Sequence, residues 1–174
     1  MKDLMNSLPQ VGEVVWLGIR PSRRASVHAI ECVMLDVVDG VAGDHFNGAA
    51  GSKRQVTLFQ DEHLRTIGEL LHREAVDPLD VRRNIVVRGI NLLALKDQEF
   101  RIGDALLCGT GTCPPCSRME ENLGPGGYNA MRGHGGITAR VVQSGLVSVG
   151  NPVSRCVVKD ASATSCHTPG GPAR

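Results

Sequence analysis

The sequence predicts a mainly β domain, a barrel or a sandwich built from about seven short strands with one good helix. Three observations lead to this prediction. Valine is the favoured aliphatic residue, and β-branched residues prefer strands. The 21 glycines and 9 prolines supply many tight turns. No part of the chain repeats the strand–helix alternation of a doubly wound sheet.

Size and charge restrict the possible functions. A chain of 174 residues is the size of one domain. Its net charge of +1 and pI near 7.7 provide no field to hold a nucleic-acid backbone. No window is apolar for long enough to cross a membrane, and the N-terminus lacks a secretory signal pattern. We therefore expect a cytoplasmic protein that binds neither nucleic acid nor membrane.

The first half of the chain contains three predicted strands and then the helix. The strands are expected at residues 11–19, 27–38 and 54–60, with a glycine-rich loop at 40–51. Apolar residues from Leu64 to Leu71 then fall at helical spacing, and Asp61 is the expected N-cap. This helix should end before Asp77-Pro78.

The second half consists of short strands around a glycine- and proline-rich stretch. Strands are expected at residues 84–87, 100–102, 105–108, 137–143 and 146–149, and residues 90–95 could be strand or helical turn. Residues 117–122 and 128–132 are expected to form short helices. From residue 160 small and polar residues dominate, so the predicted domain is 1–159 and the predicted disordered tail is 160–174.

The most chemically suggestive segment is Cys113-Pro114-Pro115-Cys116, which leaves a predicted strand and enters a predicted helix. A cysteine at a helix N-terminus lies near exposed N–H groups that favour the thiolate, and Arg118 can add to this effect. Four interpretations follow from the spacing: a redox dithiol pair, half of a zinc site, one working thiolate, or a turn without chemistry. The zinc interpretation lacks a second ligand pair, and the dithiol interpretation lacks a βαβ context.

Basic residues beside predicted strand starts form a second candidate feature. Lys53, Arg54, Arg82 and Arg83 could be solvated strand ends. Together with glycine-rich loops they could instead hold a phosphate, because arginine forks match phosphate oxygens. The glycines carry no phosphate-loop signature. His45 and His134 lie in glycine-rich loops and could touch a ligand, whereas His63 and His72 on the helix are expected at the surface.

Taken together, these segments resemble a MOSC domain, the C-terminal domain of molybdenum cofactor sulfurases, from about Val11 to Val153. The landmarks, in order, are Gly43-Asp44-His45, Arg54-Gln55-Val56-Thr57-Leu58, Arg82-Arg83-Asn84-Ile85-Val86-Val87, Ile102-Gly103-Asp104-Ala105, Cys113-Pro114-Pro115-Cys116, Arg132-Gly133-His134-Gly135-Gly136 and Val149-Gly150-Asn151-Pro152-Val153. The resemblance implies a closed Greek-key β-barrel with a few α-helices, similar to the pyruvate kinase barrel.

The resemblance also implies a site. Cys116 takes the place of the family's signature cysteine, which makes it the expected catalytic residue and molybdenum ligand. Arg82 and Asn84 match a pattern that holds the pterin in reductase relatives, and Arg54 is a further candidate for cofactor binding. Arg83 differs from those relatives, and Cys113 is a cysteine that the general pattern does not require. Pyridoxal phosphate is not expected, since it belongs to a domain that this chain lacks.

Three functions remain open from the sequence. The first is binding of a molybdenum–pterin cofactor and reduction of N-oxygenated small molecules. The second is a sulfur carrier in which Cys116 bears a persulfide for assembly of a metal–sulfur cofactor. The third is a dithiol redox module formed by Cys113 and Cys116. The first two require a partner protein that donates electrons or sulfur.

Overall fold

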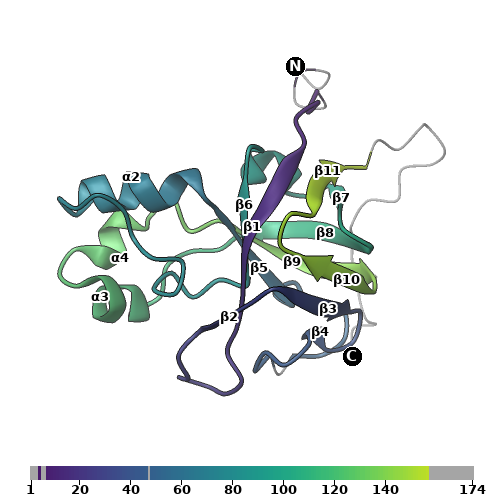
Figure 1. Ribbon diagram of the computed structural model, residues 1–174, viewed down its shortest axis with the longest axis horizontal. Helices are drawn as coiled ribbons and strands as arrows, with labels where there is room; N and C mark the ends of the chain where they lie inside the picture. The colour runs from purple at the N-terminus through teal and green to yellow at the C-terminus, as the bar shows by residue number, and fades with distance from the viewer. Residues whose placement is uncertain (1–3, 5–6, 47, 157–174) are drawn as a thin grey trace, which may run out of the picture.

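Seven strands close into a barrel in the computed structural model, which describes residues 4, 7–46 and 48–156 (Figure 1). Around the barrel they follow in the order β1 (Gly12–Ile19), β6 (Ile85–Arg88), β5 (Val56–Gln60), β9 (Ile137–Gln143), β8 (Ala105–Thr112), β7 (Glu99–Ile102) and β11 (Pro152–Arg155). Pairing of β11 with β1 closes the ring. Neighbours are antiparallel except β5 and β6. The mainly β prediction and the closed barrel are confirmed.

A smaller sheet flanks the barrel and corrects one expectation. It consists of β10 (Gly145–Ser148), β3 (Cys32–Asp36) and β4 (Gly40–Val41). The prediction of a single extended stretch at 27–38 is wrong, because two strands, β2 (His28–Ile30) and β3, form there and are separated at Glu31. β2 pairs with β1, while β3 pairs with β10, which lies more than a hundred residues later. Local sequence cannot indicate such a change of partner.

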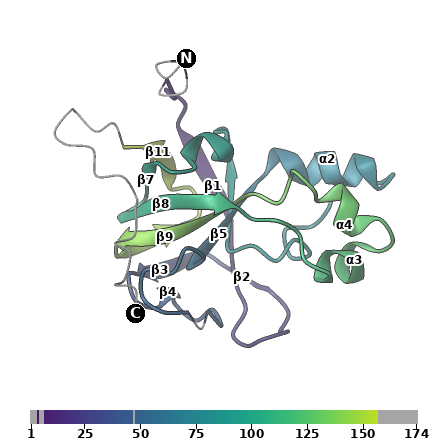
Figure 2. The same ribbon diagram turned by 180° about the vertical axis from the view of Figure 1, so that it is seen from behind.

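The helices lie together on one side of the barrel, as the front and back views show (Figures 1 and 2). They are α2 (Glu62–Leu70), α3 (Arg118–Leu123) and α4 (Gly127–Ala130), and a 3-10 turn, η1 (Leu92–Leu95), resolves the ambiguity at 90–95. Asp61 occupies the N-cap position of α2, but its side chain makes no capping hydrogen bond.

Two hydrophobic cores follow from the alternation of side chains along the strands. Leu58, Ile85 and Val87 point into the barrel interior. Their neighbours Phe59 and Val86 point outward into a second core, packed against residues of α2 and α3. Strands β5 and β6 are therefore buried on both faces, which explains why residues 85–87 of β6 are all apolar. The same burial fixes the strand ends that carry the site described below.

No helix among the described residues is both long and apolar enough to cross a membrane. The tail predicted at residues 160–174 lies outside the described residues.

Candidate functional site

One pocket of about 560 Å³ collects side chains from five separate segments. These segments are the loop after β1, the loop after β4, the start of β5, the residues before β6, and the segment after β8. Its charged and thiol-bearing lining residues are Arg20, Arg23, Asp44, Arg54, Arg82, Arg83, Cys113, Cys116 and Arg118. The structure thus brings together all four residues that the sequence assigned to the site, Arg54, Arg82, Asn84 and Cys116.

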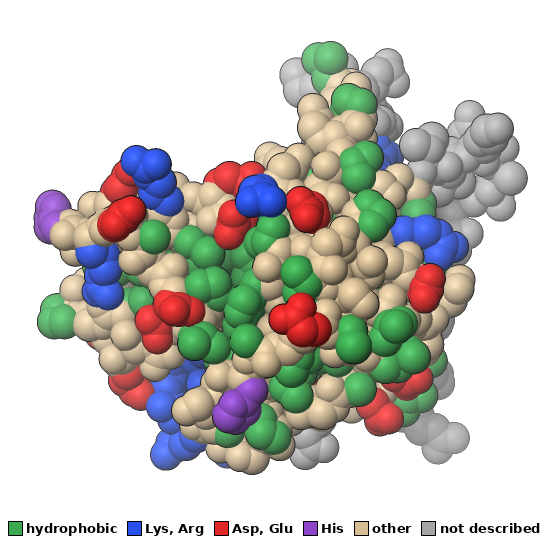
Figure 3. Space-filling model, viewed as in Figure 1, with side chains coloured by type: hydrophobic (Ala, Val, Ile, Leu, Met, Phe, Trp, Pro, Cys, Tyr) green, Lys and Arg blue, Asp and Glu red, His purple; other side chains and the backbone are tan. Residues whose placement is uncertain are grey.

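The pocket is strongly cationic. Six arginines line it and Asp44 is the one carboxylate among its lining residues, which leaves a charge of +5, whereas the whole chain carries +1. Figure 3 shows Lys and Arg side chains gathered at the lower left, where Figure 1 places α3 and the loop between β1 and β2. Such a concentration of positive charge attracts anions and favours a ligand with more than one negative charge.

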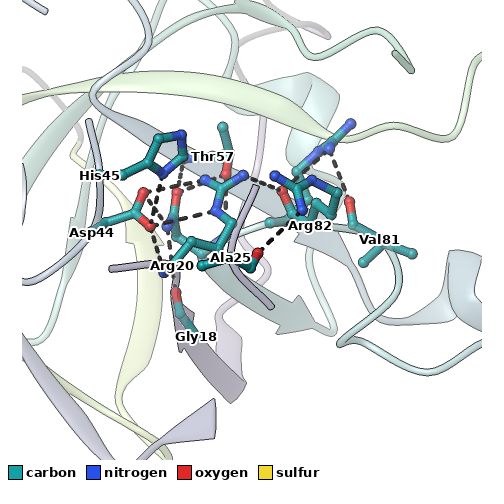
Figure 4. A network of polar contacts seen from close by, with 10 residues as sticks. Gly18, Arg20, Ala25, Asp44, His45, Thr57, Val81 and Arg82 are labelled. Carbon is teal, nitrogen blue, oxygen red and sulfur yellow. Dashed lines mark hydrogen bonds and ion pairs between the residues drawn. The ribbon is translucent and has the colours of Figure 1, made fainter. Parts of the chain in front are cut away.

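Asp44 organises the polar network at the back of the pocket (Figure 4). Its carboxylate accepts hydrogen bonds from the backbone N–H of Arg20 at 2.6 Å and from the Arg20 guanidinium at 3.2 Å. Burial alone would raise the pKa of Asp44. The Arg20 charge and the hydrogen bonds outweigh burial, so the pKa of this carboxyl lies below its usual value. Asp44 therefore stays ionised and fixes the Arg20 side chain.

Asn84 is fully engaged within the protein. Its Oδ1 accepts hydrogen bonds from the Thr57 backbone N–H and hydroxyl, at 3.2 and 2.7 Å. Its Nδ2 donates to the Gly18 carbonyl and to Asp44 Oδ2, at 3.3 and 3.2 Å. An amide side chain has two donors and an acceptor oxygen with two lone pairs, so no position remains for a ligand. This geometry favours a positioning role for Asn84, which ties β1, β5 and Asp44 together.

Arg82, unlike Asn84, lines the pocket with a side chain that makes few hydrogen bonds to the described residues. Its one side-chain hydrogen bond among the described residues goes to the Ala25 carbonyl at a long 3.5 Å (Figure 4). Burial, then the nearby charges of Arg20 and Arg118, lower the pKa of Arg82, while Cys116 opposes this shift. Its φ of 56° is left-handed, a conformation that costs a non-glycine residue about 1 kcal/mol. Crowded charge and backbone strain of this kind are typical of a ligand-binding residue.

Arg83, in contrast, is a structural clamp. The side chain is 5% exposed and donates to the carbonyls of Gly135 and Val81 at 2.9 Å. It also reaches the carbonyls of Cys113 and Pro114 at 3.4 and 3.5 Å. Burial lowers its pKa, and the two neighbouring cysteines oppose this shift. Arg83 therefore holds the cysteine segment against the loop before β9.

The two cysteines differ in exposure and in neighbours. Cys113 is 3% exposed, and its Sγ lies 3.9 Å from the Arg54 guanidinium. Cys116 is exposed at the mouth of the pocket. An electrophile or a metal can therefore reach Cys116 more easily than Cys113.

The backbone between the cysteines argues against a dithiol pair. Residues 113–116 form no helix, turn or bend. An extended Pro-Pro segment rises about 3.1 Å per residue, which puts the two Cα atoms roughly 9 Å apart. A disulfide requires Cα atoms closer than about 7 Å. Pairing Cys113 with Cys116 would thus require movement of the segment that Arg83 holds.

Two glycines bring the loop before β9 against the cysteine segment. A Cβ at Gly135 would lie 2.0 Å from the Cys113 carbonyl oxygen, and one at Gly136 would lie 1.9 Å from the Leu58 carbonyl oxygen. The Gly136 carbonyl accepts the Cys113 backbone N–H at 2.9 Å. Close backbone approach, and not phosphate binding, therefore explains these two glycines.

His134 in the same loop packs against α2 and not into the pocket. Its ring meets the His63 ring edge to face at a centroid distance of 4.8 Å. His63 was expected at the surface, but it is half-buried. The Nδ1 atoms of His63 and His134 are both buried, and neither has a hydrogen-bond partner among the described residues. Burial, followed by the charge of His134, lowers the pKa of His63 from its usual 6.5, while a hydrogen bond with the His134 backbone and the charge of Glu62 oppose the shift.

This pair is expected to make stability depend on pH. The unfolded chain protonates His63 near pH 6.5, whereas the folded protein resists that proton until its lower pKa is reached. Stability should therefore fall as the pH decreases below 6.5, with a slope of at most about 1.4 kcal/mol per pH unit from this one group. Urea unfolding measured at several pH values below 6.5 should show that the free energy of unfolding depends less on pH in His63→Gln than in the wild type. The exposed His72→Gln is the control and should keep the wild-type slope; an unchanged slope in His63→Gln would contradict the assignment.

Comparison with known proteins identifies the family. The MOSC domain profile matches residues 45–154, more than half of the chain, and includes Arg54, Arg82, Asn84 and Cys116. This chain belongs to the MOSC domain family. No curated protein sequence gives a significant match.

Solved structures show the same fold at low sequence identity. The YuaD protein of Bacillus subtilis is 18% identical, with a TM-score of 0.72 over 84% of this chain and 97% of that one. YiiM from Geobacillus stearothermophilus is 16% identical, with a TM-score of 0.69 over 84% of this chain and 75% of that one. YiiM from Escherichia coli is 19% identical, with a TM-score of 0.62 over 88% and 73% of the two chains.

Several pocket residues were not assigned to the site from the sequence, among them Arg20, Arg23, Asp44 and Thr57. A signal for the first two was present, because the loop Arg20-Pro21-Ser22-Arg23-Arg24 places three arginines directly after a strand. Thr57 carried no such signal, since its role depends on the approach of Asn84 from another strand.

Proposed function

We propose that this chain binds a molybdenum–pterin cofactor, with Cys116 as the protein ligand of the metal, and supports the reduction of N-oxygenated small molecules. The observation that carries this proposal is the presence of one exposed thiol and six arginines in a single pocket. Thiolate is a soft ligand that suits a metal in sulfur-rich surroundings. Guanidinium forks suit the phosphate of a pterin cofactor. The match to the MOSC family supports the same assignment.

The residues present fit such a group. No cluster of three or more His, Cys, Asp or Glu side chains among the described residues could hold a metal ion by itself. A metal in this pocket would therefore take one donor from Cys116 and the others from the cofactor. The zinc interpretation of the cysteine pair gains no support from the described residues for the same reason.

Each side chain would have a separate task. Arg82 would pair with the phosphate, because its guanidinium makes one long hydrogen bond to the described residues and lies near the positive charges of Arg20 and Arg118. Arg54 would add a charge beside Cys113, while Asn84 and Asp44 would hold Arg20 in place. When bound, the molybdenum centre would supply the two-electron chemistry that converts an N-hydroxylated compound, with two protons, into the amine and water. The electrons would come from a partner protein.

The exposure of Cys116 also favours a second candidate function, a sulfur carrier. The Cys116 thiolate could attack the outer sulfur of a persulfide on a donor protein, which releases the donor's thiolate and leaves a persulfide on Cys116. A thiol reductant could then release that sulfur to a metal–sulfur cofactor under assembly. The surrounding guanidinium groups would stabilise the persulfide anion as they would a thiolate.

Metal and pterin analysis tests the proposal. Protein purified from cells that synthesise the cofactor is expected to contain molybdenum and pterin in comparable amounts. A mass increase of about 32 Da on Cys116 without molybdenum would favour the sulfur carrier instead.

Arg82→Lys provides the sharper measurement. Lysine keeps the charge but cannot reproduce a bidentate fork, so cofactor retention or phosphate affinity should fall about tenfold or more while the fold stays intact. Calorimetric titration with inorganic phosphate measures the loss of phosphate affinity. The control is Arg101→Ala, an exposed arginine on β7 that does not line the pocket. Equal phosphate affinity in wild type and Arg82→Lys would remove Arg82 from the site.

A further inference from the structure

A second, smaller cavity also borders the cysteine segment. Its volume is about 270 Å³, and Cys113 and Pro114 line both this cavity and the cationic pocket. Pro115 faces only the small cavity, while Cys116 faces only the large pocket. The segment 113–116 therefore borders both cavities.

The walls of the small cavity are mainly apolar. Pro114 and Pro115 form one side, and Leu93 of η1 and Tyr128 of α4 contribute to the lining. Leu93 and Tyr128 remain 48% and 41% exposed, which leaves large apolar side chains uncovered at the cavity. A small apolar molecule seated there would cover them. The volume is just below the roughly 300 Å³ at which drug-sized pockets begin, so it suits a single ring or a short chain.

The charge of Arg132 indicates which kind of ligand this cavity can bind. Arg132 lines the cavity, no acidic residue does so, and its side chain makes no ion pair within the described part of the chain. An unpaired guanidinium beside an apolar cavity is complementary to a carboxylate carried on an apolar body.

From this combination we propose that the cavity between the Cys113–Pro115 segment and Tyr128 binds small organic monocarboxylates, with Arg132 pairing with the carboxylate and the prolines, Leu93 and Tyr128 contacting the apolar body. The site goes beyond the cofactor pocket proposed above. A ligand bound there would lie against the segment that carries Cys116.

Titration of the isotope-labelled full-length chain with benzoate, followed by nuclear magnetic resonance, tests the proposal. We expect saturable shifts in the amides of Leu93, Tyr128 and Gly133, with a dissociation constant in the millimolar range that a ligand of this size allows. Benzamide, the neutral analogue, and benzoate with Arg132→Ala should each bind about five- to tenfold more weakly.

A matched pair of variants separates this proposal from the proposed function. Arg82→Ala should weaken phosphate binding and leave benzoate affinity unchanged, whereas Arg132→Ala should do the reverse. Unchanged benzoate affinity in Arg132→Ala, or saturable shifts confined to the amides around Arg20 and Arg82, would overturn the small-cavity site. Either result leaves the assignment of the cationic pocket intact, because that assignment rests on phosphate and metal binding.

Discussion

Replacing Arg83 with alanine is expected to lower the free energy of unfolding by about 3 kcal/mol. The buried guanidinium donates to the carbonyls of Val81, Cys113, Pro114 and Gly135, and the variant would leave these acceptors without their donors. Each unsatisfied buried acceptor costs about 1–3 kcal/mol, while removal of a buried cation offsets part of the loss. A shift of the urea unfolding midpoint at constant slope measures the effect.

The adjacent residue provides the control. Arg82→Gly removes a guanidinium whose one hydrogen bond to the described part of the chain is long, and it relieves the left-handed strain at φ 56°. Relief of that strain is balanced by the greater backbone freedom of glycine, so stability should stay within about 0.5 kcal/mol of the wild type. Phosphate affinity should nevertheless fall about ten- to a hundredfold. Equal loss of stability in both variants would contradict the clamp role of Arg83.

Cys116→Ser is expected to abolish molybdenum retention or, for the sulfur carrier, persulfide loading. A serine hydroxyl is a hard donor that stays protonated at neutral pH, so it replaces a thiolate neither as a soft metal ligand nor as a sulfur acceptor. Cys113→Ser should keep most of the molybdenum, because the buried Cys113 side chain is not the exposed donor of the pocket. Elemental analysis and intact mass measure both outcomes on the same preparations.

The dithiol interpretation makes a different prediction for the same two variants. It requires complete loss of function in both, together with a reversible disulfide in the wild type. The extended geometry of residues 113–116 leads us to expect neither. Observation of both would show that the segment bends in solution, and would assign the chemistry to the pair.

Several features of this protein are determined by its local sequence. The alternation at 54–60 predicted β5. The apolar run at 84–87 predicted β6, because a strand buried on both faces of a sheet is apolar along its length. The helical spacing after Asp61 predicted α2. Arg54, Arg82, Asn84 and Cys116 were assigned by resemblance to the MOSC family, and the structure places all four around one pocket.

Tertiary structure decided the rest, because these features depend on partners distant in sequence. The exchange of sheets at Glu31 depends on β10, and the full hydrogen bonding of Asn84 depends on Thr57, Gly18 and Asp44. Adjacent arginines that look alike in sequence have opposite surroundings, since Arg83 turns toward backbone carbonyls and Arg82 toward the pocket. Burial and hydrogen bonding, which no single stretch of sequence contains, separate a clamp from a candidate ligand contact.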